Sequence, residues 1–301
     1  MNEINLNVKV AILGSGNIGT DLLIKILRSP YLECGAFIGR NPLSKGIQKA
    51  GELGIHTSSL GIEYIQKNPD CCELVFDATS ATAHAVHAPI LKKLNKFTID
   101  LTPARQGAMC VPIINLETAL QHKNVNMITC GGQATLPIIH ALSTSGAKIQ
   151  YIEVVSSIAS SSAGPATRIN LDEYIHTTEQ AIKFFAGISS AKAILNLNPA
   201  LPCIDMQTTI FAKVKDLDLQ KFTKMAAWVE KKVQSYVPGY KILLNPLIEN
   251  KRIIIIVQVK GQGDYLPDYA GNLDIINCAA LAIAEKYAMN RLSKEILCDQ
   301  S

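Results

Sequence analysis

The segment from Val8 to Gly19, VKVAILGSGNIG, decides the fold, because an apolar strand-like run leads directly into a glycine-rich turn. The turn fits the pattern G-x-G-x-x-G. Its first glycine permits a tight turn, its second lets the backbone approach a pyrophosphate, and its third lets a helix pack on the strand. TDLLIKILRS follows with apolar residues at helical spacing. We expect a dinucleotide there, with its phosphates at the helix N-terminus. The expected cofactor-binding residues are Gly14, Ser15, Gly16, Asn17, Ile18 and Gly19.

The position that normally sets the nucleotide preference lies about 20 residues further on, where an acid usually binds the ribose hydroxyls. Here it holds Gly39-Arg40-Asn41, without a carboxylate. A cation at Arg40 removes the repulsion that would exclude a 2′-phosphate, so Arg40 is a candidate cofactor residue and NADP is an alternative to NAD. The other interpretation is that Arg40 is only a solvated loop residue.

The rest of the chain divides into two regions with different patterns of strands and helices. Further strand-like runs, CGAFIG, ELVFDA, FTIDLT and VNMITC, alternate with helical segments, which predicts a parallel sheet covered on both faces. After Cys130, long strand-like runs with few helices predict an α+β lobe built on one large, mostly antiparallel sheet. We expect a dinucleotide-binding domain at residues 1–130, a catalytic and dimerisation domain at 131–271, and a C-terminal helix at 272–301 that returns to the first domain.

Composition narrows the function classes. The 301 residues are 48% hydrophobic and 18% charged, with a net charge of +4, so neither nucleic acid nor a membrane is an expected partner. Eight cysteines show no C-x-x-C spacing, which favours reduced thiols and a cytoplasmic location. His84 and His87 share a helical face but lack an obvious third ligand, so no metal is expected.

Among the eight cysteines, Cys130 has the sequence context expected of a nucleophile, in NMITCGGQATLPIIHAL at residues 126–142. Thr135 is a plausible N-cap and Pro137 suits a first helical turn, so Cys130 is expected just before a helix. The free amides there lower a thiol pKa and stabilise an oxyanion. A nucleophile and a buried, inert thiol both remain open on this pattern alone.

Six blocks together resemble one family: GSGNIGTDLLIKILRS, FDATSATAHA, IDLTPA, NVNMITCGGQAT, SAGPATRINLDEY and DYLPDYAGNLDI. They are similar to the acylating acetaldehyde dehydrogenases, which in bacterial aromatic degradation are paired with 4-hydroxy-2-oxovalerate aldolase. The resemblance implies a Rossmann-type domain plus a dimerisation domain similar to that of glyceraldehyde-3-phosphate dehydrogenase. It also implies a homodimer, and acetaldehyde that passes directly from a bound aldolase.

The same resemblance implies a reaction and its residues. Acetaldehyde, coenzyme A and NAD(P)⁺ would give acetyl-CoA through a thiohemiacetal and a thioester on Cys130, the acylated nucleophile. Asn272 would lie near the nicotinamide. The implied NAD contacts in the second domain are Ser162, Ala163, Gly164, Pro165, Ala166, Thr167, Arg168, Ile169 and Asn170.

The chain also departs from the family pattern. Thr208 stands where the family has an Asp that assists proton transfer, and a threonine cannot serve as a base near neutral pH. Asp205 is the remaining candidate for this catalytic role, although an odd offset on a strand puts its side chain on the other face. Ser161 and Ala166 also differ, which suggests either an altered nucleotide preference or drift in a less efficient enzyme.

Two alternative functions remain. One is a related reductase of the semialdehyde type that works on an acyl phosphate. That chemistry needs phosphate-binding cations in the second domain, where Arg168 is the obvious early candidate. The other is a non-catalytic NAD(P)-binding protein that kept the fold and lost catalysis with the acid that Thr208 replaces.

Overall fold

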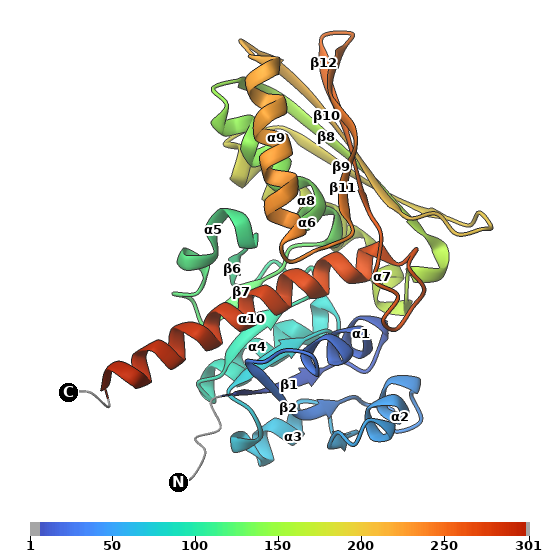
Figure 1. Ribbon diagram of the computed structural model, residues 1–301. Coiled ribbons are helices and arrows are strands. Elements are labelled where there is room, and N and C mark those ends of the chain that lie inside the picture. The colour runs from blue at the N-terminus through green and yellow to red at the C-terminus, as the bar shows by residue number, and fades with distance from the viewer. Residues whose placement is uncertain (1–6, 299–301) are drawn as a thin grey trace.

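Two separate sheets organise the chain, one in each lobe of the computed structural model (Figure 1). The structure describes residues 7–298, apart from the side chains of Ala166 and of residues 294–298. None of the helices within this range combines the length and hydropathy that a membrane crossing requires. All seven cysteines whose side chains are described are free thiols, in agreement with the expectation of reduced cysteines.

The first sheet has seven strands in the order β3-β2-β1-β4-β5-β7-β6, and every pairing is parallel. Alternate residues of β1 enter two different cores, Val10 and Ile12 on one face and Ala11 and Leu13 on the other. The predicted parallel sheet, buried on both faces, is therefore confirmed. Its strands are β1 (Val8–Leu13), β2 (Leu32–Ile38), β3 (Thr57–Ser58), β4 (Leu74–Asp77), β5 (Phe97–Asp100), β6 (Ala108–Met109) and β7 (Asn124–Asn126).

Helices connect these strands and cover the two faces (Figure 1). The first of them starts directly at the glycine turn, as the sequence predicts. The short strands β3 and β6 were not anticipated, because two residues are too few to show a period. The helices are α1 (Asn17–Ile26), α2 (Lys45–Glu52), α3 (Ile62–Lys67), α4 (Ala81–Lys93) and α5 (Pro112–Ala119), with a 3₁₀ turn at Pro69–Cys71.

The second sheet has five strands in the order β11-β12-β10-β8-β9, all antiparallel except the β8–β9 pair. Helices cover one of its faces and leave the other open (Figure 1). The elements are α6 (Cys130–Thr144), β8 (Lys148–Ala159), a 3₁₀ turn (Ser160–Ser162), α7 (Pro165–Ile169), α8 (Leu171–Ala186), β9 (Ala191–Asn198), β10 (Met206–Lys215), α9 (Leu219–Gln234), β11 (Tyr240–Glu249) and β12 (Arg252–Val259).

The last helix, α10 (Gly271–Cys298), crosses back from the second lobe and runs along α1 (Figure 1). Ile276 and Ile283 enter the core of the first lobe together with Leu22 and Leu23 of α1. The Asn277 amide donates hydrogen bonds to the carbonyl of Ile18 at 3.1 Å and to the Asp21 carboxylate at 2.7 Å. Its first turn is thereby held beside the glycine turn.

Candidate active site

The helix that carries Cys130 begins earlier than the sequence predicts. β7 ends at Asn126, Ile128 turns the chain with φ +67°, and Thr129 caps the helix by accepting a hydrogen bond from the Gly132 amide at 2.9 Å. Thr135 is therefore not the N-cap. Its hydroxyl donates to the Gly131 carbonyl inside the helix at 2.7 Å. Pro137 also lies within the helix, and Cys130 is the first helical residue.

The thiol of Cys130 lies against a buried tyrosine. Its Sγ is 3.7 Å from the Tyr174 hydroxyl, and the same hydroxyl accepts a hydrogen bond from the Gly131 amide at 3.1 Å. Burial raises the pKa of the Cys130 thiol to about 11. The hydrogen bonds of Tyr174 and of the helix amides act in the opposite direction, because they favour thiolate. The expected lowering of this pKa is therefore wrong, because desolvation outweighs the helix N-terminus.

A narrow cavity of about 70 Å³ contains the thiol. It opens into a larger cavity of about 670 Å³ over the glycine turn. The two are contiguous, so a ligand that lies over the turn of the first lobe can reach the sulfur of the second. The residues that line both cavities are Ile18, Ala78, Thr79, Thr167, Asn170 and Leu273.

The first and third turn glycines have the steric roles that the motif predicts. Gly14 has φ +115°, and a Cβ there would lie 2.4 Å from the Ala78 carbonyl oxygen. A Cβ on Gly19 would lie 1.9 Å from the Gly14 carbonyl oxygen, so only glycine lets α1 approach the strand. A Cβ on Gly16 would instead meet no described atom of a more distant residue within 4 Å. Because Gly16 makes no side-chain cap, the first amides of α1 face this open space, which suits a pyrophosphate.

The far end of the larger cavity holds the groups that would contact a nucleotide ribose. Arg40 and Asn41 line it, and Arg40 makes no hydrogen bond or ion pair with another described residue. Ser15 and Ser44 are joined by a hydrogen bond of 2.9 Å beside them. Glu63 of α3 lines the same cavity, paired with Lys67 at 3.3 Å. Sequence reasoning missed this carboxylate, because it comes from a later strand–helix connection.

The segment 162–170 lies only partly against the larger cavity. Arg168 turns back to its own segment, where its guanidinium donates to Ser160 at 2.9–3.0 Å and to the Ala163 carbonyl at 3.2 Å. Ala163 packs into the core of the second lobe, and the Ala166 side chain lies outside the described residues. The lining residues of the segment are Ser162, Gly164, Pro165, Thr167, Ile169 and Asn170.

Two buried polar atoms beside the thiol lack a partner. Asn272 is 5% exposed and lines the narrow cavity, yet its Oδ1 accepts no hydrogen bond within the described part of the chain. Thr102 lines the same cavity, and its Oγ1 is similarly unpaired. Because an unpaired buried polar group is costly, these atoms mark places for the polar groups of a ligand.

Thr208 lies on the covered face of the second sheet, 1% exposed, with its hydroxyl 3.1 Å from that of Ser156. Asp205 instead accepts a hydrogen bond from Gln258 at 3.1 Å. Gln258 pairs with Gln207, whose side chain alternates with that of Thr208 and lies on the other face. The ladder has no bulge in this region. Asp205 is therefore not brought to Cys130, and the catalytic role considered for it is withdrawn.

Comparison with known proteins shows the family of the chain. A family model described as prokaryotic acetaldehyde dehydrogenase, dimerisation, matches residues 130–267. An acetaldehyde dehydrogenase of Spirochaeta aurantia is 58% identical over 93% of this chain and 95% of its own. One of Pectobacterium atrosepticum is 52% identical over 98% and 100%. The chain belongs to the acetaldehyde dehydrogenase family.

The fold of this acetaldehyde dehydrogenase family member also has a solved counterpart. A Vibrio cholerae aspartate semialdehyde dehydrogenase II superposes with a TM-score of 0.62 over 95% of this chain and 99% of its own, at 14% identity. At that identity the likeness shows the fold alone. It confirms the predicted architecture of an α/β domain with a parallel sheet followed by an α+β domain.

Behind the cavities of this family member, a buried histidine joins the ends of two parallel strands. His84 Nδ1 lies 2.9 Å from the Asp77 carboxylate, and His84 Nε2 lies 3.5 Å from that of Asp100. Burial opposes ionisation of Asp77, but its hydrogen bonds to His84 and His87 outweigh burial and lower its pKa to about 2. Burial raises the pKa of Asp100 to about 7. Both histidines thus bind Asp77.

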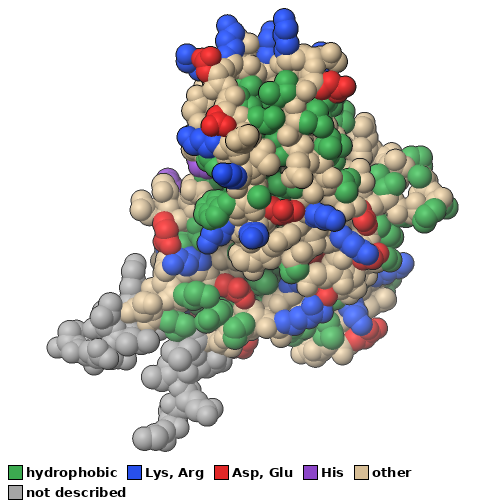
Figure 2. All heavy atoms as spheres, turned by 45° about the horizontal axis from the view of Figure 1, so that its top comes forward, with side chains coloured by type: hydrophobic (Ala, Val, Ile, Leu, Met, Phe, Trp, Pro, Cys, Tyr) green, Lys and Arg blue, Asp and Glu red, His purple; other side chains and the backbone are tan. Residues whose placement is uncertain are grey.

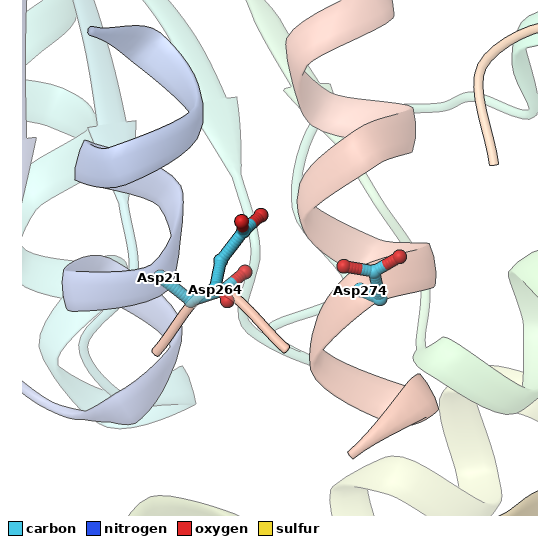
Figure 3. A group of neighbouring side chains, drawn as sticks. All are labelled: Asp21, Asp264 and Asp274. Carbon is cyan, nitrogen blue, oxygen red and sulfur yellow. The ribbon is translucent and has the colours of Figure 1, made fainter. Parts of the chain in front are cut away.

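A second ionic cluster fixes the start of α10. Figure 3 shows Asp21 of α1, Asp264 of the loop before α10, and Asp274 of α10 turned toward one another. The Lys25 ammonium lies 3.0, 2.6 and 2.8 Å from their respective oxygens, so the cation position of this acidic group is filled by a side chain. Burial opposes its charge, but Asp21 and Asp274 outweigh burial and raise the pKa of Lys25. The cluster holds Asn272 of α10 at the cavity.

Proposed function

We propose that the chain is a coenzyme-A-acylating acetaldehyde dehydrogenase that uses Cys130 as its nucleophile. One observation carries the proposal: the Cys130 thiol at the start of α6 lies in a narrow cavity that opens into the cavity over the glycine turn. An aldehyde bound to the sulfur would thus lie next to a nicotinamide. The names of the relatives support the same substrate.

The residues fit a nicotinamide dinucleotide, which when bound supplies the hydride acceptor. The amides after Gly16 would hold the pyrophosphate, and the unpaired Asn272 Oδ1 would accept a hydrogen bond from the carboxamide. Cys130 adds to the aldehyde carbonyl to give a thiohemiacetal. Loss of hydride from its carbon, with release of its hydroxyl proton, leaves an acetyl thioester, and the coenzyme A thiol then takes the acetyl group. The apolar residues that line this cavity disfavour water beside the thioester.

The size of the narrow cavity supports a short aldehyde. At about 70 Å³ it is much smaller than the adjoining cavity of about 670 Å³. Acetaldehyde has three heavy atoms, which suits this space, whereas a branched or aromatic aldehyde requires the walls to move. Leu101, Ile128 and Ile276 provide the apolar lining that would contact the methyl group.

The nucleotide preference follows from two opposed charges at the ribose end. The unpaired guanidinium of Arg40 favours a 2′-phosphate, whereas the carboxylate of Glu63 disfavours one. Because Lys67 pairs with Glu63, part of this repulsion is neutralised. We propose that NAD is the cofactor and that NADP is also accepted.

The open face of the second sheet supports a homodimer. Val155, Phe211, Ile254 and Ile256 alternate with the buried residues of their strands and remain half-exposed. The family model that matches this region is itself described as a dimerisation domain. In the space-filling view, hydrophobic side chains gather over the second lobe with charged ones around them (Figure 2).

Further partners are proposed from the resemblance. The reactive product of a 4-hydroxy-2-oxovalerate aldolase would pass directly to the Cys130 cavity, as in aromatic hydrocarbon catabolism. The free thiols support a reducing, cytoplasmic setting. The acyl-phosphate alternative is less favoured, because the guanidinium of Arg168 is engaged by Ser160 and Ala163.

Reduced-nucleotide absorbance tests the proposal. The protein is mixed with acetaldehyde and NAD or NADP, with and without coenzyme A, beside Cys130→Ala. We expect steady turnover only with coenzyme A and only with Cys130. Protein that binds the nucleotide but gives no turnover with either one would instead favour a non-catalytic NAD(P)-binding protein.

A further inference from the structure

The acid–base composition of the Cys130 cavity is unusual for an enzyme that must move a thiol proton. Among the described residues that line it, Cys130 and Tyr174 are the only two that titrate, and the others are apolar, amide or hydroxyl residues. Asp, Glu, His and Lys are absent from that lining. Burial raises the thiol pKa to about 11, so at neutral pH the sulfur carries its proton. A general base of the ordinary kind is thus missing from the contacts of the sulfur.

Tyr174 occupies the place where such a base would act. It is 7% exposed, and its hydroxyl contacts the Cys130 Sγ at 3.7 Å and the Gly131 amide nitrogen at 3.1 Å. The approach is so close that a Cβ on Gly131 would lie 2.2 Å from the Tyr174 oxygen. Glycine at 131 is therefore required for the hydroxyl to reach the sulfur.

Two further hydroxyls, those of Ser156 and Thr208, continue the row of hydrogen bonds from Tyr174. The Tyr174 oxygen accepts from the thiol and from the Gly131 amide, and the Ser156 hydroxyl makes a further hydrogen bond with it. Ser156 is in turn 3.1 Å from the Thr208 hydroxyl. Ser156 and Thr208 are each 1% exposed, so this row of hydroxyls is closed to bulk water.

We propose that Tyr174 is a catalytic proton carrier, which passes the Cys130 proton to the aldehyde oxygen as the sulfur attacks, with Ser156 and Thr208 as positioning residues. The inference rests on the proposed function. The Sγ–C bond forms while the carbonyl π bond opens. The thiol proton moves to the Tyr174 oxygen, and the Tyr174 proton moves to the former carbonyl oxygen. The product is a neutral thiohemiacetal, and Tyr174 ends as it began.

This route needs neither a free thiolate nor a carboxylate. Burial raises the pKa of Tyr174 well above 10, so its hydroxyl keeps its proton throughout the neutral range. The carrier is therefore present in its working form wherever the thiol is also protonated. A chain with Thr208 in place of an acid can then retain the acylation step.

Tyr174→Phe tests the proposal in the full-length protein. The burst of reduced nucleotide is followed by stopped flow with acetaldehyde and NAD, without coenzyme A, from pH 6 to 9. The matched control is Tyr287→Phe, which removes the hydroxyl of a tyrosine that stacks on Phe97, in the core of the first lobe. Dissociation constants for NAD confirm that each variant keeps the cofactor site.

We expect the burst rate constant of Tyr174→Phe to fall about 100-fold, within the usual range for general acid–base groups. What remains must use thiolate, so it should rise close to tenfold per pH unit, while the wild-type burst stays nearly flat. Ser156→Ala should lose about tenfold in burst rate, less than the roughly 100-fold or more usual for a group that itself transfers the proton, with NAD affinity unchanged.

The possible outcomes distinguish failure of the proton-carrier role from failure of the proposed function. A Tyr174→Phe burst within about threefold of wild type, or a slower one with the wild-type pH profile, overturns the proton-carrier role and leaves the proposed function intact. If Tyr174→Phe fails to fold, a Ser156→Ala burst equal to wild type overturns it. Wild-type protein that gives no burst with acetaldehyde overturns both.

Discussion

Thr208 Oγ1 lies 3.1 Å from Ser156 Oγ, so adjacent strands of the second sheet hold a pair of hydroxyls behind Tyr174. The family pattern has a carboxylate at this position. The pair is neutral. A proton that leaves the Cys130 thiol therefore meets no charged acceptor among the described residues that line the cavity. These hydroxyls are held in place by packing and hydrogen bonds alone.

Thr208→Asp should restore such an acceptor. A carboxylate beside Ser156 can draw the thiol proton through Tyr174, so we expect the burst rate to rise about tenfold above the pKa of the new acid, less than the usual effect of a general base in direct contact. The pH profile should change from flat to sigmoidal. Stopped-flow bursts from pH 5.5 to 8.5 check this, with Thr208→Asn as the neutral, isosteric control. Equal bursts from the Asp and Asn variants would contradict the expectation.

Alkylation of Cys130 should be slow at neutral pH. Because burial raises the pKa of the thiol to about 11, only a small fraction is thiolate, and the rate with iodoacetamide should climb nearly tenfold per pH unit from 7 to 10. Peptide mapping of the labelled protein follows Cys130 beside the half-buried thiol Cys203. A rate at Cys130 that is already maximal at pH 7 would show that the helix amides outweigh burial.

Nucleotide choice should respond in opposite directions at two residues. Arg40→Ala should reduce kcat/KM for NADP about tenfold, the scale of one surface contact to a phosphate, and leave that for NAD nearly unchanged. Glu63→Gln should improve NADP, since it removes a negative charge from the same cavity. Steady-state kinetics with both nucleotides measure the ratio. Parallel changes for NAD and NADP would mean that neither residue faces the ribose phosphate.

The sequence predicts the cofactor half of the site well, because its signals are local. β1, the glycine turn and α1 follow one another within 19 residues, and the close contact that requires Gly19 lies within that unit. The start of α6 was misplaced because Thr129 and Thr135 are both good caps. Two glycines after Cys130 also resemble a break in helix, whereas buried packing overrides their low propensity.

The proton-handling half could not be found in the same way. Tyr174 is separated from Cys130 by 44 residues, and Ser156 from Thr208 by 52, so only the tertiary fold brings these groups together. One signal was available: Tyr174 lies one helical turn after Asn170, an expected cofactor residue, and thus shares its face. Likewise the pKa of Cys130 depends on burial, which no helix-cap pattern reports.

The stability of the first lobe should fall as pH rises from 5 to 7, because of Asp100. Its folded pKa, raised to about 7 by burial, lies above an unfolded value near 3.9. Between these values the folded state keeps a proton that the unfolded state releases, so stability is lost with rising pH until about 7. His84 acts in the same direction: its raised pKa contributes stability below about 6.5 that is lost at higher pH. The pKa of Asp77, lowered to about 2, leaves its contribution constant over this window.

Asp100→Asn isolates this effect. The amide keeps an oxygen for the Thr102 amide hydrogen bond but cannot ionise. We expect the unfolding free energy of wild type relative to the variant to decline by up to about 1.4 kcal/mol per pH unit between pH 5 and 7, the limit for one proton. Urea titrations at half-unit intervals measure the difference. A difference that stays constant across this range would mean that Asp100 is already ionised beside His84.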